Sequence, residues 1–562
     1  MSKLKEINEI LKISEDGKTV LGMNDEFVTS IEIPEGIEVI GEKAFQHCSI
    51  LMKVTIPESV KFIRGGAFLG CKLLYSINLP LQLKEIEDCV FSQCEHLESI
   101  DIPCGVERIG TSAFAGCSSL KNVILPSSLK TISNRAFSDC NSLERIIIPG
   151  TVKDVNSEDE FYMCEKIKSI ELEEGIESMN SPFHGCTSVK TIKIPNSLKE
   201  FGGTFFDSFK SLKKIIISNN HPYFVFTDNV LYSKDKKRIV FALKSIGPHF
   251  DVPKSVKKID KGAFYGCTRL EEITFHDNVS SIGHHAFWGC KRLKKIVLPS
   301  KLRKLEDFTF VGCTSLHDVI LPSGLKTIGW RAFGGCKSLH HIHIPKSVIK
   351  FDTTGWDLQE YTVCPENKHF ATIDGVLYNK DFTKLIAMPP GRKYKIFCIP
   401  ESVTEIGREA FCNCKNLWYI VILDSVKKIG ISAFYGCSSL KEIYFPEGIR
   451  TIPEKAFNGC KALKSIRLPN TLKRINDSAF CGCENLTSIL IPPSVKYVGV
   501  YAWPYDLREL HISYKDPRKG YILLHAVCCY SDEFTIFVPK ELKEIYENDI
   551  IYKNYVIKEE EQ

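Results

Sequence analysis

The sequence predicts an α/β repeat protein, a curved solenoid with short parallel strands on its concave face and short helical turns opposite. Two observations predict this fold class. An apolar–x–apolar–Pro segment, then Ala-Phe, Cys and Leu, recurs about every 23 residues. Each copy also carries apolar residues that a single coil cannot bury, whereas stacked coils can bury them. Self-similarity at a short fixed period is the signature of such stacks and overrides estimates of domain number from length.

Each repeat has two chemically different halves. Alternation in 489–491 predicts a strand with its outer residues buried and the middle one exposed. Pro492 then ends the strand, since proline has no N–H to donate. The Ala-Phe-x-x-Cys half, as at Phe114 and Cys117, predicts a helical turn with Ala and Phe directed inward. The glycine that often precedes the cysteine, as at Gly116, allows the chain to bend there.

About 19 repeats run from Ile31 to about Leu510, interrupted by hairpins around two Lys-Asp turns. A related hairpin opens the chain, and solenoid ends need such caps. The predicted organisation is 1–30 as an N-terminal capping hairpin, 31–217, 250–351 and 397–512 as three repeat blocks, 218–249 and 352–396 as hairpin insertions, and 513–562 as a C-terminal cap. In that cap, 536–539 is expected to form a last strand, followed by a helical segment with Leu542, Ile545, Tyr546 and Tyr552.

Composition narrows the function classes. Apolar residues make up 44% and charged residues 25% of 562 residues, as in soluble proteins with a buried core. A net charge of +5 is too small to indicate a nucleic-acid partner. No stretch approaches the roughly 18 apolar residues of a membrane helix, and the N-terminus has no apolar signal region. The chain as given therefore predicts a cytoplasmic protein without membrane insertion.

Most of the 23 cysteines follow the repeat. Equivalent side chains on stacked coils point the same way, which argues against bridges between them. We expect a ladder of buried, reduced thiols that behave as small apolar residues. The ladder positions are Cys48, Cys71, Cys94, Cys117, Cys140, Cys164, Cys186, Cys267, Cys290, Cys313, Cys336, Cys414, Cys437, Cys460 and Cys483.

The repeated unit, with Pro after the strand and then Ala-Phe, Cys and Leu, resembles that of the BspA-like leucine-rich repeat family. The resemblance covers nearly the whole chain, and the two hairpins and the Val538-Pro539 ending are similar to accessory elements of that family. It implies a leucine-rich-repeat solenoid. It also implies a cell-surface or secreted location and adhesion to host matrix proteins or to other cells.

The middle residue of each strand is expected to face outward, and this column changes character along the chain. It is acidic and polar at first and later becomes apolar and aromatic. Exposed residues of these types are common in binding hot spots. The candidate binding residues are Tyr419, Val421, Tyr444, Leu490, Ile124 and Ile147. The alternative is that the hairpins or packing between repeats cover them.

One cluster resembles a metal site. His341 and His343 are two residues apart on a predicted strand and so share a face, with Asp318 one coil earlier. Two imidazoles and a carboxylate could hold zinc. The alternative is a solvated polar patch, and we predict no metal or cofactor.

A basic residue often follows the apolar residue in the middle of the repeat. Stacking would align these residues into a stripe that could attract a polyanion. A solvated, solubilising stripe is the favoured interpretation, because acidic residues are interspersed. The members are Lys61, Lys84, Lys130, Lys153, Lys199, Lys257, Arg303, Lys326, Lys427, Arg450, Lys473 and Lys496.

No nucleophile elbow, phosphate-binding glycine loop or HExxH motif is present, so no enzyme activity is predicted. The favoured function is a monomeric recognition scaffold that binds a protein or glycan through the concave face. A host-directed adhesin is one form that such a scaffold could take. Two alternatives remain: an intracellular structural or assembly scaffold with an endogenous partner, and a metal-dependent activity at the histidine cluster.

Overall fold

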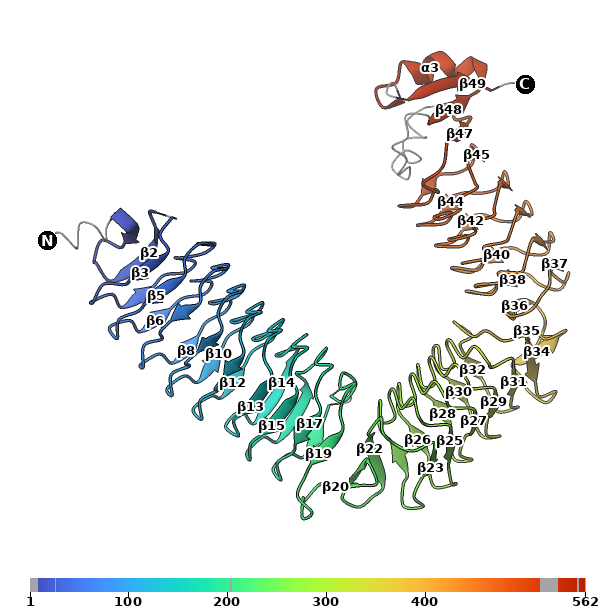
Figure 1. The fold of residues 1–562 in the computed structure, drawn as a ribbon. Coiled ribbons are helices and arrows are strands. Elements are labelled where there is room, and N and C mark those ends of the chain that lie inside the picture. Colours follow the sequence, from blue (N-terminus) through green and yellow to red (C-terminus); the bar gives the residue numbers. More distant parts are fainter. Residues whose placement is uncertain (1–8, 26, 203–204, 516–533, 553–554, 561–562) are drawn as a thin grey trace. The chain divides into compact units, whose positions relative to one another are not determined.

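The computed structural model describes residues 9–25, 27–202, 205–515, 534–552 and 555–560 (Figure 1). Over these residues the chain is a parallel-strand solenoid of about 22 turns with almost no helix, which confirms the predicted fold class but exceeds the predicted repeat count. It divides into two compact units. The N-terminal unit is Met1–Leu270 with Ile282–Cys290, and the C-terminal unit is Glu271–Ser281 with Lys291–Gln562.

A regular coil contains two short strands. The first precedes the proline of the repeat, and we call these strands the first-strand row. In the N-terminal unit the row is β3 (Ser30–Glu32), β5 (Lys53–Thr55), β7 (Ser76–Ile77), β9 (Ser99–Ile100), β11 (Asn122–Val123), β13 (Arg145–Ile148), β15 (Ser169–Leu172), β17 (Thr191–Lys193), β19 (Lys214–Ile216) and β23 (His249–Asp251). In the C-terminal unit it is β25 (Glu272–Thr274), β27 (Lys295–Val297), β29 (Asp318–Ile320), β31 (His341–Ile344), β33 (Glu360–Val363), β37 (Ile396–Cys398), β39 (Tyr419–Val421), β41 (Glu442–Tyr444), β43 (Ser465–Arg467), β45 (Ser488–Ile491) and β47 (Glu509–Ile512).

The second strand of each coil was not predicted, and we call these strands the second-strand row. The row begins with β4 (Val39–Ile40), β6 (Phe62–Ile63), β8 (Glu85–Ile86), β10 (Arg108–Ile109), β12 (Thr131–Ile132), β14 (Asp154–Glu158), β16 (Ser178–Ser181), β18 (Glu200–Phe201) and β24 (Lys258–Ile259). It continues with β26 (Ser281–Ile282), β28 (Lys304–Leu305), β30 (Thr327–Ile328), β32 (Lys350–Phe351), β38 (Glu405–Ile406), β40 (Lys428–Ile429), β42 (Thr451–Ile452), β44 (Arg474–Ile475) and β46 (Tyr497–Val498).

Equivalent residues of neighbouring coils stand opposite each other in both rows. Ile31 pairs with Val54 in the first-strand row, and Arg108 pairs with Thr131 in the second, both in parallel register. A side chain therefore lies about 4.8 Å from its equivalent in the next coil. Residues at the same position of successive repeats therefore form continuous columns along the solenoid.

The Ala-Phe segment forms tight turns and not the predicted helical turn. Ser112 and Gly116, which flank Phe114 by two residues, both have left-handed backbone, with φ of 53° and 76°. A helix cannot accommodate such residues in its interior. The backbone N–H of Phe114 donates instead to the carbonyl of Ala136 in the next coil, at 2.7 Å. The turn segments thus form a further ladder of hydrogen bonds between coils.

Phenylalanine rings stack along the core of each unit. In the N-terminal unit Phe114 and Phe137 lie with ring centroids 5.0 Å apart and planes 8° from parallel. In the C-terminal unit Phe434 and Phe457 have the same separation and angle. These side chains are fully buried, and the apolar strand residues surround them.

The ladder cysteines are buried free thiols with one recurring partner. The Sγ of Cys117 donates to the carbonyl of Phe91 in the preceding coil at 3.2 Å, and that of Cys437 donates to Phe411 at 3.0 Å. Such a carbonyl can also accept a backbone N–H within its own coil, as that of Phe114 does from Cys117 at 3.2 Å. A thiol suits this position because it is small, mostly apolar and still a weak donor.

Every described cysteine is a free thiol, and we expect native alkylation to separate the exposed cysteines from the ladder cysteines. Cys104 and Cys398 are exposed and should react with iodoacetamide in the folded protein. Burial raises the pKa of Cys117 to about 12, so ladder thiols should react only after unfolding. Peptide mass spectrometry without reductant checks both points. Disulfide-linked peptides joining successive ladder cysteines would contradict the expectation. Cys528 and Cys529 lie outside the described residues.

One two-stranded and two three-stranded antiparallel hairpin segments occur in the described chain, and the last strand of each joins the second-strand row. They are β1 (Leu11–Ile13) with β2 (Thr19–Met23), β20 (Phe224–Thr227) and β21 (Val230–Ser233) with β22 (Arg238–Ala242), and β34 (Phe370–Ile373) and β35 (Val376–Asn379) with β36 (Lys384–Ala387). β2, β22 and β36 pair in parallel with β4, β24 and β38. The hairpins therefore supply turns of the solenoid, which is one reason that the repeat count was too low.

The described C-terminal residues continue the first-strand row. β48 (Thr535–Val538) pairs in parallel with β47, and β49 (Val556–Glu559) pairs with β48, so the segment expected to be a last strand has a further strand beside it. Between them lie the 3-10 helix η2 (Lys540–Leu542) and the helix α3 (Lys543–Glu547). Tyr546 and Tyr552 are fully buried, whereas Ile545 is exposed.

Candidate recognition surface

The first-strand row presents alternate side chains to solvent. In β39, Ile420 is 3% exposed, whereas Tyr419 and Val421 on either side are exposed. Parallel register sets Val421 opposite Tyr444 of β41, and Tyr444 is 61% exposed. An aliphatic and an aromatic side chain therefore lie side by side on the outward face, within the spacing at which cross-strand neighbours make contact.

The neighbouring strand β37 extends this apolar surface. Ile396 stands opposite Tyr419 and is 64% exposed, and Cys398 stands opposite Val421. We call Ile396, Tyr419, Val421 and Tyr444 the apolar patch. Sequence reasoning missed Ile396, although a signal was present: Ile396 precedes Cys398 by two residues and so shares its face.

Leu490 lies apart from the apolar patch. Tyr444 pairs with Arg467 of β43, so a cation follows the patch in the next coil. Leu490 is exposed on β45, one coil beyond Arg467, and stands opposite His511. Charged and polar side chains thus interrupt the apolar column that the sequence predicted.

Ile124 and Ile147 belong to the N-terminal unit and form a separate feature. Ile124 is 80% exposed, and Ile147 is exposed in the following coil of the first-strand row. Ile147 stands opposite Glu171, which ion-pairs with Arg145 and Lys193. The apolar stretch on this unit is accordingly short and ends at a charged network.

Cations border the apolar patch. The indole of Trp418, next to Tyr419 in the chain, lies between the ammonium groups of Lys395 and Lys441, which are 4.4 and 4.3 Å from its ring centroid. These two cation–π contacts hold the ring of Trp418 in place. The hydroxyl of Tyr444 donates to Glu442 at 3.2 Å. The patch is therefore an apolar centre with a charged rim.

The histidine cluster has different partners from those expected. Nδ1 of His341 lies 2.9 Å from a carboxylate oxygen of Glu360, its partner in β33. His343 contacts Thr362, and Asp318 ion-pairs with Lys295 at 2.8 Å. Within the described ranges, no group of three or more His, Cys, Asp or Glu side chains is arranged to hold a metal ion. The cluster is a set of exposed polar pairs between coils.

None of the described helices is long and apolar enough to cross a membrane.

The chain belongs to the BspA type leucine-rich repeat region family. The family model, which holds 6 copies of the repeat, matches residues 23–144, 107–235, 237–357 and 392–507. Leucine-rich-repeat scaffolds of this kind are typical of protein-interaction and adhesin families. The predicted family membership is therefore confirmed.

Solved structures of similar proteins include a leucine-rich repeat protein from Bacteroides ovatus, 27% identical, which covers 78% of this chain and 93% of its own, with a TM-score of 0.44. A leucine rich cell surface protein from Faecalibacterium prausnitzii is 18% identical and covers 98% of this chain and 96% of its own, with a TM-score of 0.36. The pneumococcal vaccine antigen PcpA is 21% identical and covers 70% of this chain and 92% of its own, with a TM-score of 0.42. No curated protein matches the chain.

Proposed function

We propose that this protein is a non-enzymatic recognition scaffold that binds a protein or glycan partner through the outward face of the first-strand row, as an adhesin directed at a host does. The apolar patch is the observation that carries the proposal. Its four side chains are exposed on three successive coils, in register, and no part of the described chain covers them.

Exposed side chains of this kind cost solvation free energy that a partner can recover by covering them. Aromatic residues at the centre of an interface, surrounded by polar groups, are the usual hot-spot arrangement. Tyr444 and Tyr419 would serve as central contacts. Lys395, Lys441 and Arg467 would form the charged rim.

The double substitution Tyr419→Glu with Tyr444→Glu is expected to lower affinity for the partner by about tenfold or more, since it places two charges in the centre of the interface. The melting temperature should stay within about 2 °C of the parent, because exposed side chains contribute little to stability. A pull-down compares the parent and the variant side by side, using extract from host cells and extract from the producing cells. Partners found only in the producing cells would favour an endogenous assembly role over adhesion.

A matched control carries the same change in charge on another face. Ile431 and Tyr435 lie in a turn segment of the C-terminal unit and are exposed to a similar degree as Tyr419. The variant Ile431→Glu with Tyr435→Glu should keep the parent's affinity for the captured partner. Equal loss in both variants would show a non-specific charge effect and would contradict the proposal. So would a sharp fall in melting temperature of the patch variant, because the patch would then be covered within the fold.

A further inference from the structure

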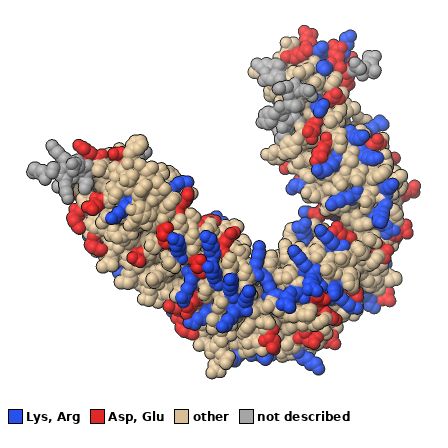
Figure 2. Space-filling model, viewed as in Figure 1, with Lys and Arg blue, Asp and Glu red and all other residues tan. Residues whose placement is uncertain are grey.

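The residue directly before the second strand is basic in many coils, and in three coils of the N-terminal unit an ion pair neutralises this charge. There, basic residues at this position pair with glutamates at the same position one coil earlier. The pairs are Lys61 with Glu38, Lys130 with Glu107, and Lys199 with Glu177, at 2.9, 2.6 and 2.5 Å. Glu38, Glu107 and Glu177 therefore interrupt the predicted basic stripe in these coils. Figure 2 shows such basic and acidic side chains interspersed over the face in view.

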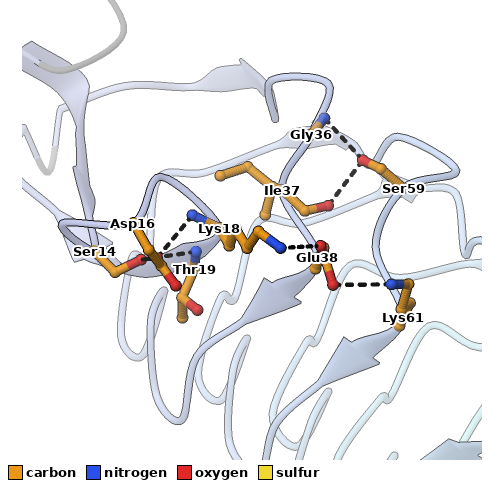
Figure 3. Close-up of polar contacts among 9 residues, drawn as sticks. All are labelled: Ser14, Asp16, Lys18, Thr19, Gly36, Ile37, Glu38, Ser59 and Lys61. Atoms are coloured by element: carbon orange, nitrogen blue, oxygen red, sulfur yellow. Dashed lines mark hydrogen bonds and ion pairs between the residues drawn. The ribbon is translucent and has the colours of Figure 1, made fainter.

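Glu38 illustrates the neutralisation most fully (Figure 3). Its carboxylate accepts from Lys18 at 2.8 Å and from Lys61 at 2.9 Å. These two donors, Lys18 first, lower the pKa of Glu38 to about 2. Lys61 is accordingly shared within the protein and is a poor site for an external anion.

Four successive coils of the C-terminal unit lack this compensation. In these coils the same position holds Lys427, Arg450, Lys473 and Lys496, which we call the late basic row. The N–H of Lys473 donates to the carbonyl of Arg450, and that of Lys496 to Lys473, both at 2.8 Å, so the row is in register. All four side chains are exposed. Spaced by about 4.8 Å per coil, the row spans about 14 Å.

Within the described part of the chain, no carboxylate lies at ion-pair distance from any of these four cations. The ammonium group of Lys427 donates to the backbone carbonyl of Asp424. The nearest acidic side chains in sequence are those of Asp424 and Glu447, in the loops three residues before Lys427 and Arg450, and Glu447 instead accepts from the side-chain amide of Asn470. The same loop position in the next two coils holds Asn470 and Pro493, so the end of the row at Lys496 is the least neutralised.

We propose that the late basic row binds an extended sulfated polysaccharide. A single file of evenly spaced cations complements a linear chain that carries fixed charges along its edge. Sulfate oxygens accept the forked donors of a guanidinium and the ammonium donors of lysine. The row shares no residue with the apolar patch, so this inference does not depend on the function proposed above.

The surroundings of the row favour a polysaccharide over single-stranded nucleic acid. Binding of single strands needs exposed aromatic faces on which bases can stack. The aromatic residue of the second-strand row in these coils is Tyr497, which is half-buried, and the guanidinium of Arg474 lies over its ring at 4.1 Å. The face therefore offers charge without a stacking platform.

The test measures binding of a size-fractionated heparin oligosaccharide by titration calorimetry at several salt concentrations. The triple variant Arg450→Gln, Lys473→Gln, Lys496→Gln should bind about tenfold or more weakly than the parent, and the salt dependence of its affinity should fall by about one unit of slope per cation removed. The matched control is Lys61→Gln, Lys130→Gln, Lys199→Gln, which removes the same charge from the same repeat position and should bind within about twofold of the parent. The charge-retaining variant Lys473→Arg with Lys496→Arg should keep the parent's affinity.

Equal weakening in the two triple variants would overturn the proposal, because net charge alone would then explain binding. Undiminished binding of the desulfated oligosaccharide would also overturn it. So would tighter binding of a single-stranded oligonucleotide or of poly-glutamate at equal charge, which would assign the row to a different partner. Failure of the apolar-patch experiment would leave these readouts unchanged.

Discussion

Replacing Phe114 with alanine is expected to lower the free energy of unfolding by about 3–5 kcal/mol, as large-to-small changes in packed cores do. Phe114 is fully buried and stacks on Phe91 on one side and on Phe137 on the other, with centroid distances of 5.4 and 5.0 Å. Removing the ring leaves a cavity that these neighbours, fixed by hydrogen bonds between coils, cannot fill. Phe434→Ala should have a similar effect in the C-terminal unit.

Chemical denaturation gives the free energy, and limited proteolysis locates the damage. Because solenoid contacts are between neighbouring coils, new cleavage sites should appear first in the coils next to the substitution. Phe62→Ala is the matched control, since Phe62 is exposed on the second-strand row and its removal should change stability by no more than about 0.5 kcal/mol. An unchanged unfolding midpoint together with an unchanged cleavage pattern for Phe114→Ala would show that the ring stack does not carry stability.

Ending the chain at Lys515 is expected to cause aggregation or loss of the last coils. The described residues that follow cover the coil of β47: β48 pairs with β47, and the hydroxyl of Tyr546 donates to the carbonyl of Tyr514 at 2.9 Å. Without them, Leu510 and Ile512 would lose neighbours that now bury them completely. The bare strand edge of β47 would also become available for pairing with other chains.

Size-exclusion chromatography with light scattering and thermal melting tests this expectation. A point variant in the same segment, Ile550→Glu, is the control, because Ile550 is exposed and its substitution should leave the protein monodisperse. A truncated protein that is monomeric and as stable as the parent would show that the segment is dispensable to the fold.

The period of the sequence predicted the buried columns well, because each column repeats one residue type in a fixed place. The period did not predict two features of the fold, the second strand and the turn at Ala-Phe, and each has a physical reason. The second strand is only two residues long in most coils, as at Arg108–Ile109, and so gives no alternation to detect. The helical turn expected at Ala-Phe failed because residues such as Ser112 and Arg135 adopt left-handed backbone without being glycine.

The candidate site was harder to predict than the fold. Exposure of Tyr444 and Val421 followed from strand alternation, and the structure places them side by side. The sequence also suggested that Tyr444 and Leu490 belong to one apolar column, but Arg467 lies between them. The partner of His341 was also missed: the coil that holds Glu360 is shorter than 23 residues, so counting by the period does not align the two.

Because the coils stack in register, the residues that hold the fold together and the residues that face a partner occupy different columns of this chain. The inward columns of Phe, Cys and Ile are nearly uniform, and hydrogen bonds join each coil to the coils before and after it. The outward column of the first-strand row, by contrast, changes at every step, from Cys398 through Val421 and Tyr444 to Arg467 and Leu490. One surface position can therefore mutate without disturbing the core, and a whole coil can be gained or lost by gene duplication or deletion while the ladder stays intact. Specificity in such a protein can evolve one coil at a time.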